Sequence, residues 1–462
     1  MRRPYQNVIE AIGDTPVVRL NSLATDLECE IYVKLEYMNP AGSIKDRIAL
    51  EMIEDAEQSG RLKPGGTIVE ATSGNTGQGL AMVAATRGYK CVFVMPDKMS
   101  DEKVRNLRAY GARVVITPTA VEPSDPRSYY SVSKRLSEEI PGAILANQYH
   151  NPANPRAHYK STGPEIHEQM PDLDYLCLGL GTGGTVTGAG KYLKEKNPKL
   201  EVVGVDPAGS VYYDYWKTGI LPKLFKTYKI EGVGEDFMPS TIDFKYINHV
   251  VQVTDGEAFT ITRRMVQEEG IFCGGSAGMA VSGGLKFAAE KKLGKGKKML
   301  ILLPDGGAKY LSKIFNDDWM REYGFLDVHE KLGRVREIVG SKPASGVITA
   351  HPSDPVRKIV HLMKDKGISQ LPVVETMDGG DKLVGIINEV ALLNYLLEGE
   401  NLDKPIDPIV ERDASTVTAD APISRLKEIF SKGKIAVVVE GGKVVGIVTK
   451  IDMIDFLARK VA

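Results

Sequence analysis

Short apolar runs alternate with helix-like segments from about residue 30 to residue 315, and this alternation limits the possible folds more than any other feature. Each run is rich in Val, Ile and Leu and ends near Gly, Pro or Asp. The runs cover residues 67–71, 91–95, 113–117, 175–180, 201–205 and 299–303. Between them, residues 44–59 repeat apolar side chains at helical spacing and stop at Gly60. The alternation predicts an α/β fold with a largely parallel sheet.

An internal repeat begins some distance after Phe325. Residues 380–397 (GDKLVGIINEVALLNYLL) align with residues 441–458 (GGKVVGIVTKIDMIDFLA). The repeat predicts a first domain at 1–325, a linker at 326–340, and two related units at 341–398 and 406–462. Each unit is too small to bury its apolar face alone, so we expect the two units to pack on each other.

Composition excludes several classes of partner. Lys and Arg total 59 and Asp and Glu total 60, without a long basic run, which argues against nucleic acid. No apolar run reaches the length of a membrane helix, and the first residues do not resemble a signal peptide. The seven histidines form no ligand cluster, so no protein-bound metal is expected. Four scattered cysteines without a C-x-x-C pair fit a reducing cytoplasm.

Three glycine-rich segments lie where an expected strand meets an expected helix. Residues 72–77 (TSGNTG) place N–H groups and hydroxyls at a helix start, which suits a carboxylate, although a plain capped turn reads the same way. Residues 181–185 (GTGGT) form a nest of N–H donors suited to a phosphate. Residues 274–278 (GGSAG) offer a hydroxyl that could meet a ring nitrogen. Tight packing of a helix on a sheet is the alternative interpretation of that segment.

The second of these segments also fits another ligand. Residues 179–184 read G-x-G-x-x-G, and Asp206 follows 22 residues later, after an expected strand. This is the spacing of a dinucleotide-binding fingerprint. By itself, the segment therefore suits an NAD-dependent dehydrogenase as well as an enzyme that binds a monophosphate.

Lys45 stands out because it lies in the first turn of an expected helix. Ser43 and Asp46 form a capping-box-like start around it. The positive end of a helix disfavours a cation, so this ammonium should lose its proton more readily. A neutral amine is what Schiff-base formation requires. Most lysines at such positions are simply solvated, and that interpretation stays open at this point.

Five motifs together resemble the fold-type II pyridoxal-phosphate enzymes. They are PAGSIKDR (40–47), TSGNTG (72–77), MPDKMS (95–100), GTGGT (181–185) and GGSAG (274–278). Residues 7–325 resemble the cystathionine β-synthase family, with cysteine synthase as close kin, and residues 341–462 resemble a pair of CBS domains. The resemblance implies a tryptophan synthase β-like catalytic fold with a C-terminal tandem CBS (Bateman) module. Only a few residues precede the expected catalytic fold, so haem is not expected.

The resemblance implies a role for each motif residue. Lys45 would bind the aldehyde of pyridoxal 5′-phosphate and shuttle the substrate's Cα proton. The cofactor phosphate would be held by Gly181, Thr182, Gly183, Gly184 and Thr185. Asn75 would contact the 3′-oxygen of the ring, and Ser276 its pyridine nitrogen. The amino-acid substrate would be bound by Thr72, Ser73, Thr76, Gln148 and Tyr149.

The reaction implied is condensation of L-serine with L-homocysteine to L-cystathionine, the transsulfuration step, which hydrogen sulfide production could accompany. Two alternatives are cysteine synthesis from O-acetylserine and sulfide, and a non-catalytic adenine-nucleotide sensor. Two departures bear on the thiol and on the leaving group. Glu235 stands where the family commonly has Tyr, and the Asp305-Gly306-Gly307 segment stands where it commonly has Asp-Ser.

The repeat carries an expected regulatory site. Residues 446–452 (GIVTKID) resemble the CBS-domain nucleotide motif, which implies that Thr449 and Asp452 bind an adenosyl ligand such as S-adenosylmethionine, AMP or ATP. The first copy has Ala391 in place of the Asp, so we expect at most one such site. A purely structural dimerisation module is the alternative. The family implies a cytoplasmic homodimer or homotetramer.

Overall fold

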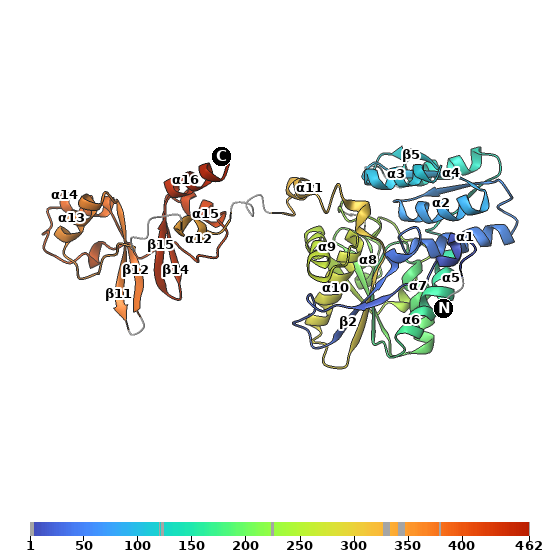
Figure 1. The fold of residues 1–462 in the computed structure, drawn as a ribbon, viewed down its shortest axis with the longest axis horizontal. Coiled ribbons are helices and arrows are strands. Elements are labelled where there is room, and N and C mark those ends of the chain that lie inside the picture. Colours follow the sequence, from blue (N-terminus) through green and yellow to red (C-terminus); the bar gives the residue numbers. More distant parts are fainter. Residues whose placement is uncertain are drawn as a thin grey trace. The chain divides into compact units, whose positions relative to one another are not determined.

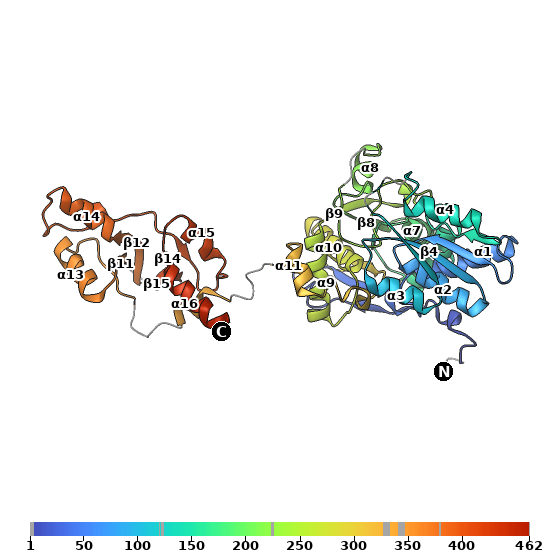
Figure 2. The ribbon, with the colours of Figure 1, turned by 90° about the horizontal axis from the view of Figure 1, so that it is seen from above.

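The computed structural model describes residues 4–119, 121, 124–222, 226–326, 333–340, 347–377 and 380–461. The chain divides into two compact units, Met1–Phe325 and Leu326–Ala462 (Figures 1 and 2). The first unit alternates strands and helices, and its sheets are parallel except at one edge. The prediction of an α/β fold is therefore confirmed.

A six-stranded sheet forms the centre of the first unit, in the order β1-β2-β10-β7-β8-β9. Its strands are β1 (Val17–Arg19), β2 (Glu30–Leu35), β10 (Lys298–Leu303), β7 (Tyr175–Gly179), β8 (Glu201–Pro207) and β9 (His249–Val253). Only the β1–β2 pair is antiparallel among these strands. Strand β10 is apolar and almost wholly buried because it has strands on both sides and helix α10 (Gly275–Glu290) against it.

A second, four-stranded parallel sheet has the order β5-β4-β3-β6. Its strands are β5 (Arg113–Thr117), β4 (Lys90–Pro96), β3 (Thr67–Ala71) and β6 (Ala143–Leu145). Helices α1 (Lys45–Gln58) and α2 (Asn75–Arg87) pack together beside this sheet (Figure 1). The other helices described in this unit are α3 (Asp101–Ala109), α4 (Tyr129–Glu139), α5 (Ala153–Ala157), α6 (Gly163–Gln169), α7 (Gly184–Lys196), α8 (Tyr212–Thr218), α9 (Asp255–Glu269) and α11 (Asp317–Glu322).

Helix α10 is rich in glycine because it runs very close to its neighbours. A Cβ on Gly278 would lie 2.0 Å from Thr262 Oγ1 of helix α9. A Cβ on Gly283 would lie 2.5 Å from Val205 Cγ1 of strand β8. Close packing of the helix therefore accounts for several of its small residues, whatever role Ser276 has at its first turn.

The second unit contains two related β-β-α segments. The first has β11 (Gln370–Met377), β12 (Gly380–Asn388) and α14 (Glu389–Leu397), preceded by α13 (Val356–Lys366). The second has β14 (Ala436–Glu440), β15 (Lys443–Val448) and α16 (Lys450–Val461), preceded by β13 (Thr416–Val417) and α15 (Arg425–Ser431). Each hairpin shifts register at the equivalent place, Val373/Val374 and Val438/Val439. The two copies of the sequence repeat therefore share the same backbone irregularity as well as the same order of elements.

The two copies share a core, as their small size predicts. Ile386 of the first copy packs in one cluster with Ile435 and Val437 of the second. The segment expected to be a linker at 326–340 differs from the prediction, because helix α12 (Val335–Gly340) buries Val335 and Ile338 in the core of the second copy. Residues 327–332 of that segment and the first residues of the unit expected at 341–398 (341–346) lie outside the described residues.

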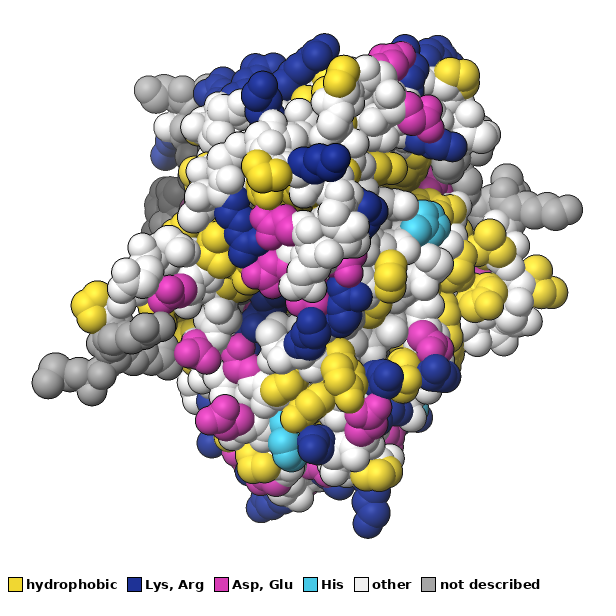
Figure 3. Space-filling model, turned by 90° about the vertical axis from the view of Figure 1, so that its right-hand side faces the viewer, with side chains coloured by type: hydrophobic (Ala, Val, Ile, Leu, Met, Phe, Trp, Pro, Cys, Tyr) yellow, Lys and Arg dark blue, Asp and Glu magenta, His cyan; other side chains and the backbone are white. Residues whose placement is uncertain are grey.

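The surface of the first unit carries charges of both signs. On the face in Figure 3, Lys and Arg side chains alternate with Asp and Glu rather than gathering into one basic area. Within the described part of the chain, no helix combines the length and apolar character needed to cross a bilayer.

Candidate functional site

Helix α1 begins at Lys45, which places this residue in the first turn as predicted. The Lys45 N–H donates to Ser43 Oγ at 3.2 Å. The expected capping box takes a different form, because Asp46 Oδ2 accepts from the Ala41 N–H at 2.6 Å. Asp46 is fully buried, and its carboxylate ties the glycine-containing turn before the helix to the helix itself.

The Lys45 amine is easier to deprotonate than an ordinary lysine. Burial lowers its pKa, although the carboxylates of Asp305, Glu235 and Glu36 oppose this effect. Desolvation penalises the charged form of an amine, so the neutral, nucleophilic form is more accessible here. Lys45 therefore has the electronic character required of a Schiff-base lysine and of a base.

The loop before helix α7 tolerates only glycine at two consecutive positions. Gly183 has φ +84°, and a Cβ there would lie 2.2 Å from Ile242 Cβ. A Cβ on Gly184 would lie 1.8 Å from Asn154 Oδ1. The first N–H groups of a helix have no partner within the helix, so this loop offers donors to an anion at the positive helix end.

The hydroxyls of this loop are oriented from a neighbouring segment. Asn154 Nδ2 donates to Thr182 Oγ1 at 3.0 Å, and Thr185 Oγ1 lies 3.1 Å from His158 Nε2. Burial lowers the pKa of His158 well below its usual value, with the charges of Lys45 and Arg47 acting in the same direction. His158 is therefore neutral, and it fixes Thr185 by a hydrogen bond without bringing a charge.

Lys45 and the glycine loop face the same space. A narrow cavity of about 30 Å³ is lined by Lys45 together with Gly181, Thr182, Gly183 and Thr185. A larger cavity of about 590 Å³ shares Lys45 and Thr182 with it, and Ser73, Gln148 and Tyr149 also line it. Segments that are more than 130 residues apart in the sequence thus bring an amine beside a site for a phosphate.

The 72–77 loop is held in shape by its own threonines. Thr72 Oγ1 accepts from the N–H groups of Gly74 at 3.0 Å and Gly77 at 3.2 Å. Thr76 Oγ1 donates to Gln148 Oε1 at 2.6 Å. Of the expected substrate residues in this loop, only Ser73 lines the large cavity, and Thr72 and Thr76 support its shape from behind.

Sequence reasoning missed Glu70, which positions the predicted residue Gln148 and its neighbour Asn147. Its buried carboxylate accepts from the N–H of Asn147 at 2.6 Å and of Gln148 at 3.2 Å. Burial raises its pKa to about 8, and these two N–H groups oppose that rise. Asn147 has φ +58°, so the turn before Gln148 depends on this support. The available signal was a lone acidic residue inside an apolar strand.

Asn75 and Ser276 lie beside the cavities rather than among the residues that line them. Asn75 Nδ2 donates to Asp305 Oδ2 at 2.8 Å, and Lys309 Nζ donates to Asn75 Oδ1 at 2.8 Å. Ser276 is 3% exposed, and its carbonyl lies about 4.0 Å from where a Cβ on Gly179 would be. Ser276 therefore lies against the end of strand β7 that leads into the phosphate-type loop.

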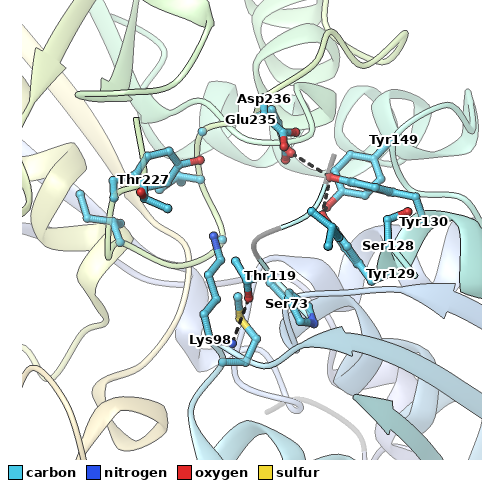
Figure 4. Close-up of a pocket in the computed structure, with 18 of the residues that line it drawn as sticks. Ser73, Lys98, Thr119, Ser128, Tyr129, Tyr130, Tyr149, Thr227, Glu235 and Asp236 are labelled. Atoms are coloured by element: carbon cyan, nitrogen blue, oxygen red, sulfur yellow. Dashed lines mark hydrogen bonds between the residues drawn. The ribbon is translucent and has the colours of Figure 1, made fainter. Parts of the chain in front are cut away.

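The outer part of the large cavity is polar and aromatic. Figure 4 shows Lys98 extending from one wall, with Glu235 and Asp236 opposite it beside tyrosines 129, 130 and 149. Tyr130 OH donates to Glu235 Oε2 at 3.5 Å. Burial, followed by the neighbouring Asp236, raises the pKa of Glu235 well above its usual value.

The second departure noted in the sequence lies between the turn before helix α1 and the segment before helix α10, because Asp305 pairs with Ser43 and Gly306 pairs with Cys273. A Cβ on Gly306 would lie 3.5 Å from Tyr37 Cβ, so a small side chain would fit there. A Cβ on Gly307 would lie 2.4 Å from Phe272 Cε2, so that position requires glycine as the ring is placed.

The residues of the expected regulatory site lie at the start of helix α16. Thr449 donates to Asp452 Oδ2 from its N–H at 2.7 Å and from its hydroxyl at 2.6 Å, which forms a capping box. A cavity of about 330 Å³ in this unit lies instead between the two copies, where Asn388 and Glu389 of the first copy and Lys434 of the second are among its lining residues.

No group of three or more His, Cys, Asp or Glu side chains able to hold a metal ion occurs among the residues that the structure describes. The site combines the Lys45 amine, a loop of N–H donors and a cavity with charged walls.

Comparisons with known proteins agree with this arrangement. The family model for pyridoxal-phosphate dependent enzymes matches residues 8–305, and the CBS domain model matches residues 335–398 and 406–459. A cystathionine beta-synthase of Dictyostelium discoideum is 38% identical over 473 residues, which cover 98% of this chain and 92% of that protein. An O-acetylserine dependent cystathionine beta-synthase from Helicobacter pylori has a TM-score of 0.62 at 36% identity, covering 68% of this chain and 99% of that one. A hydrogen sulfide-producing enzyme from Fusobacterium nucleatum has a TM-score of 0.62 at 37% identity, covering 67% of this chain and all of that one.

Proposed function

Because the chain belongs to the cystathionine β-synthase family of pyridoxal-phosphate-dependent enzymes, we propose that it condenses L-serine with L-homocysteine to give L-cystathionine and water. The observation that carries this proposal is that the Lys45 amine and the loop at 181–185 line one cavity. A dinucleotide enzyme has no need of a buried amine beside its glycine loop. The fingerprint spacing of residues 179–184 is therefore better explained by a monophosphate.

The residues of the site fit pyridoxal 5′-phosphate. Its phosphate would be held by the N–H groups and hydroxyls of residues 181–185, because two glycine positions there leave no room for a side chain. Asn75 would donate to the 3′-oxygen of the ring, and Ser276 would meet the pyridine nitrogen. When bound, the cofactor supplies an electron sink for the electrons left at the substrate's Cα. Ser276 is a neutral partner, which favours loss of the β-substituent over transamination.

Lys45 performs the proton transfers in this proposal. Its amine takes the Cα proton of serine and later returns it to Cα. The β-hydroxyl leaves as water with a proton that is balanced by the one lost from the homocysteine thiol, and the thiolate sulfur forms the new bond to Cβ. A general base of this kind needs a pKa near the working pH, and burial moves the Lys45 pKa in that direction. Gln148, held by Thr76, and Ser73 would bind the substrate carboxylate.

The larger cavity supports a charged thiol as the second substrate. Its volume of about 590 Å³ exceeds what sulfide needs, and its walls carry the cations Lys98 and Arg127 and the carboxylate of Asp236, with Glu235 beside it. Homocysteine has both an ammonium and a carboxylate, so it can pair with walls of both signs. Hydrosulfide is a small anion that can use only the positive walls, so it gains less from this cavity than homocysteine does.

A substrate competition assay tests the proposal. Purified protein is offered serine and O-acetylserine together, with homocysteine or sulfide as the thiol, and products are quantified by mass spectrometry. We expect kcat/KM for serine with homocysteine to exceed that for O-acetylserine with sulfide by at least about tenfold, since bound charged groups contribute roughly 1.4 kcal/mol or more.

The alternative has specific support, because two solved structures similar to this chain are an O-acetylserine dependent cystathionine beta-synthase and a hydrogen sulfide-producing enzyme. A preference for O-acetylserine with sulfide in the competition would replace our proposal with cysteine synthesis. Protein that stays colourless after addition of pyridoxal phosphate would instead favour the non-catalytic nucleotide sensor.

We expect Gly184→Ala to weaken cofactor binding. A Cβ at Gly184 would lie 1.8 Å from Asn154 Oδ1, so the loop or Asn154 must move away from its place. Overpacking of this kind costs on the order of 1–3 kcal/mol, or about tenfold in the dissociation constant. The measurement is a fluorescence titration of apoprotein with pyridoxal phosphate.

A matched control for that variant lies on the same helix. A Cβ on Gly190 would have no neighbour closer than 3.5 Å, so Gly190→Ala should bind the cofactor as the wild type does. Equal affinities for the Gly184→Ala and wild-type proteins would contradict the phosphate assignment.

We further propose that the CBS pair binds an adenosyl ligand at Thr449 and Asp452. Asp452→Ala is expected to weaken binding of S-adenosylmethionine or ATP about tenfold, because the ligand loses a hydrogen bond to a charged group. Calorimetry measures the affinity. The visible absorbance of the bound cofactor should be unchanged. If the ligand binds normally to Asp452→Ala but fails with Asn388→Ala, the site lies in the cavity between the two copies.

The regulatory unit supports an oligomer as well. Helices α14 and α16 expose apolar side chains at equivalent repeat positions: Val390, Leu393, Ile451 and Ile454 are 56–68% exposed. An apolar face duplicated by the repeat suits a symmetric contact, so we propose a homodimer or homotetramer.

All four cysteines are unpaired and buried, which supports a reducing, cytoplasmic location.

A further inference from the structure

Lys309 begins a buried chain of hydrogen-bonded polar groups that runs through Asn75 to Asp305. Its Nζ donates to Asn75 Oδ1 at 2.8 Å and to the Gly42 carbonyl at 3.1 Å. Asn75 Nδ2 in turn donates to Asp305 Oδ2 at 2.8 Å. Lys309 is 6% exposed, and Asn75 and Asp305 are also buried. These hydrogen bonds therefore form away from water, where an unmade bond is costly.

This chain of groups contacts the segments that would surround the cofactor. Asp305 pairs by its backbone with Ser43, two residues before Lys45, and its carbonyl accepts from the Gly274 N–H at 3.0 Å, two residues before Ser276. Asn75 itself is the first residue of helix α2. Residue 309 is therefore linked, through Asn75 and Asp305, to the segments that carry Lys45 and Ser276.

The bonds on Asn75 determine which group its amide can offer. A primary amide has one carbonyl oxygen and two N–H bonds. Lys309 occupies the oxygen and Asp305 takes one N–H, so what the amide has left to give an incoming ligand is an N–H donor. The structure assigns Lys309 as a positioning residue of the cofactor site, which holds the Asn75 amide so that an N–H points to the anionic 3′-oxygen of the cofactor ring. This inference rests on the proposed contact between Asn75 and that oxygen.

The charge on Lys309 adds to this effect. Burial lowers its pKa to about 8, with the carboxylates of Asp305 and Asp46 opposing the fall and Lys103 reinforcing it. The amine is thus mostly protonated at neutral pH. An ammonium hydrogen-bonded to the amide oxygen polarises the amide, which makes its N–H a stronger donor to an oxyanion.

The test measures cofactor binding and the absorption spectrum rather than turnover. Apoprotein of the full chain is titrated with pyridoxal phosphate for the wild type, Lys309→Met, Asn75→Ala and the double variant. We expect Lys309→Met to weaken binding about tenfold and to shift the visible absorption maximum in the same direction as Asn75→Ala. In the Asn75→Ala background, Lys309→Met should change the affinity by less than about twofold, because residues that act through one another are not additive.

Two further variants separate positioning from general stability. Lys309→Gln retains an N–H donor for Asn75 and should recover most of the affinity, whereas Lys295→Met, at an exposed lysine, should change nothing. The assignment would be overturned if Lys309→Met lowered the cofactor affinity equally in the wild-type and Asn75→Ala backgrounds. It would also be overturned if Lys309→Gln lowered the affinity as much as Lys309→Met does. Failure of the wild type to bind pyridoxal phosphate would instead remove the proposed function itself.

Discussion

Replacing Lys45 with alanine should lower the rate of β-replacement by at least about 10³-fold while the protein stays folded. The expected loss is large because one amine both attaches the cofactor and transfers the Cα proton, and each role is worth orders of magnitude. Lys45 lines the cavity at the first turn of helix α1, so the substitution removes its chemistry without removing a core side chain. The measurement is cystathionine formed per unit time, with circular dichroism as the check on folding.

Lys63→Ala is the matched control for that variant. Lys63 is exposed in the turn after helix α1, and it should retain wild-type activity. Added pyridoxal phosphate should colour the wild type and Lys63→Ala, but the Lys45→Ala protein should not show the same covalently bound spectrum. Substantial turnover by Lys45→Ala would refute the role assigned to this amine.

Arg47→Met should destabilise the first unit by about 3–5 kcal/mol, because it leaves the buried Glu36 carboxylate without its ion-pair partner and removes one of the two cations on Glu165. Arg47 Nε lies 2.8 Å from Glu36 Oε2, and Arg47 NH1 lies 2.9 Å from Glu165 Oε2. The side chains of Arg47 and Glu36 are 2% and 0% exposed, so water cannot replace the lost bonds. The control is Arg61→Met, whose pair with Asp55 is exposed and should be worth at most about 1 kcal/mol.

Tryptophan fluorescence can follow the first unit alone. Both tryptophans of the chain, Trp216 and Trp319, belong to Met1–Phe325, so their signal in urea reports that unit without the CBS pair. If Arg47→Met and Arg61→Met unfold at the same urea concentration, the buried network contributes no more than a surface pair, contrary to our expectation.

The difference between wild type and Arg47→Met should shrink in acid. Burial alone would raise the pKa of Glu36, but the charge and hydrogen bonds of Arg47 outweigh it and the pKa lies below its ordinary value. A depressed carboxylate stabilises the folded state above its unfolded pKa of about 4.3, and this contribution is lost as the pH falls through the folded pKa. In the Arg47→Met variant the Glu36 carboxylate has lost its cation, so protonating it removes an unpaired buried charge and reduces the destabilisation. A difference that grows below about pH 4 would contradict this account.

Much of the fold was predictable because its signals are local. The apolar runs at 67–71 and 113–117 are the strands β3 and β5 with unchanged bounds, and Lys45 begins helix α1 after a glycine-containing turn. The glycine loop at 181–185 was recognisable for the same reason, since it needs a positive φ and close approach at particular positions. The repeat in the second unit was predictable because its two sequences align directly, and the structure shows it as two hairpins with the same register shift.

Other features depend on contacts between residues that are far apart in the chain. The connector predicted at 326–340 includes helix α12, because Val335 and Ile338 find a core made by residues after 417. From the sequence, Glu70 is an unexplained acidic residue in an apolar strand. In the structure its carboxyl group accepts hydrogen bonds from the backbone N–H groups of Asn147 and Gln148. Thr72 and Thr76, whose contacts with substrate stay a prediction, also hold the loop and Gln148 in place.

Local patterns were enough to specify the elements, the lysine at a helix start and the loops of N–H donors, since these follow from the propensities and backbone geometry of neighbouring residues. Long-range packing alone established that Lys45 and residues 181–185 share a cavity, and that Asn75 lies between Asp305 and Lys309, 230 and 234 positions away. The cause is that a buried polar side chain must find its hydrogen-bond partners wherever packing places them. Those partners lie at the ends of strands that are brought together by the packing of the two sheets. No local sequence pattern specifies which strand ends meet.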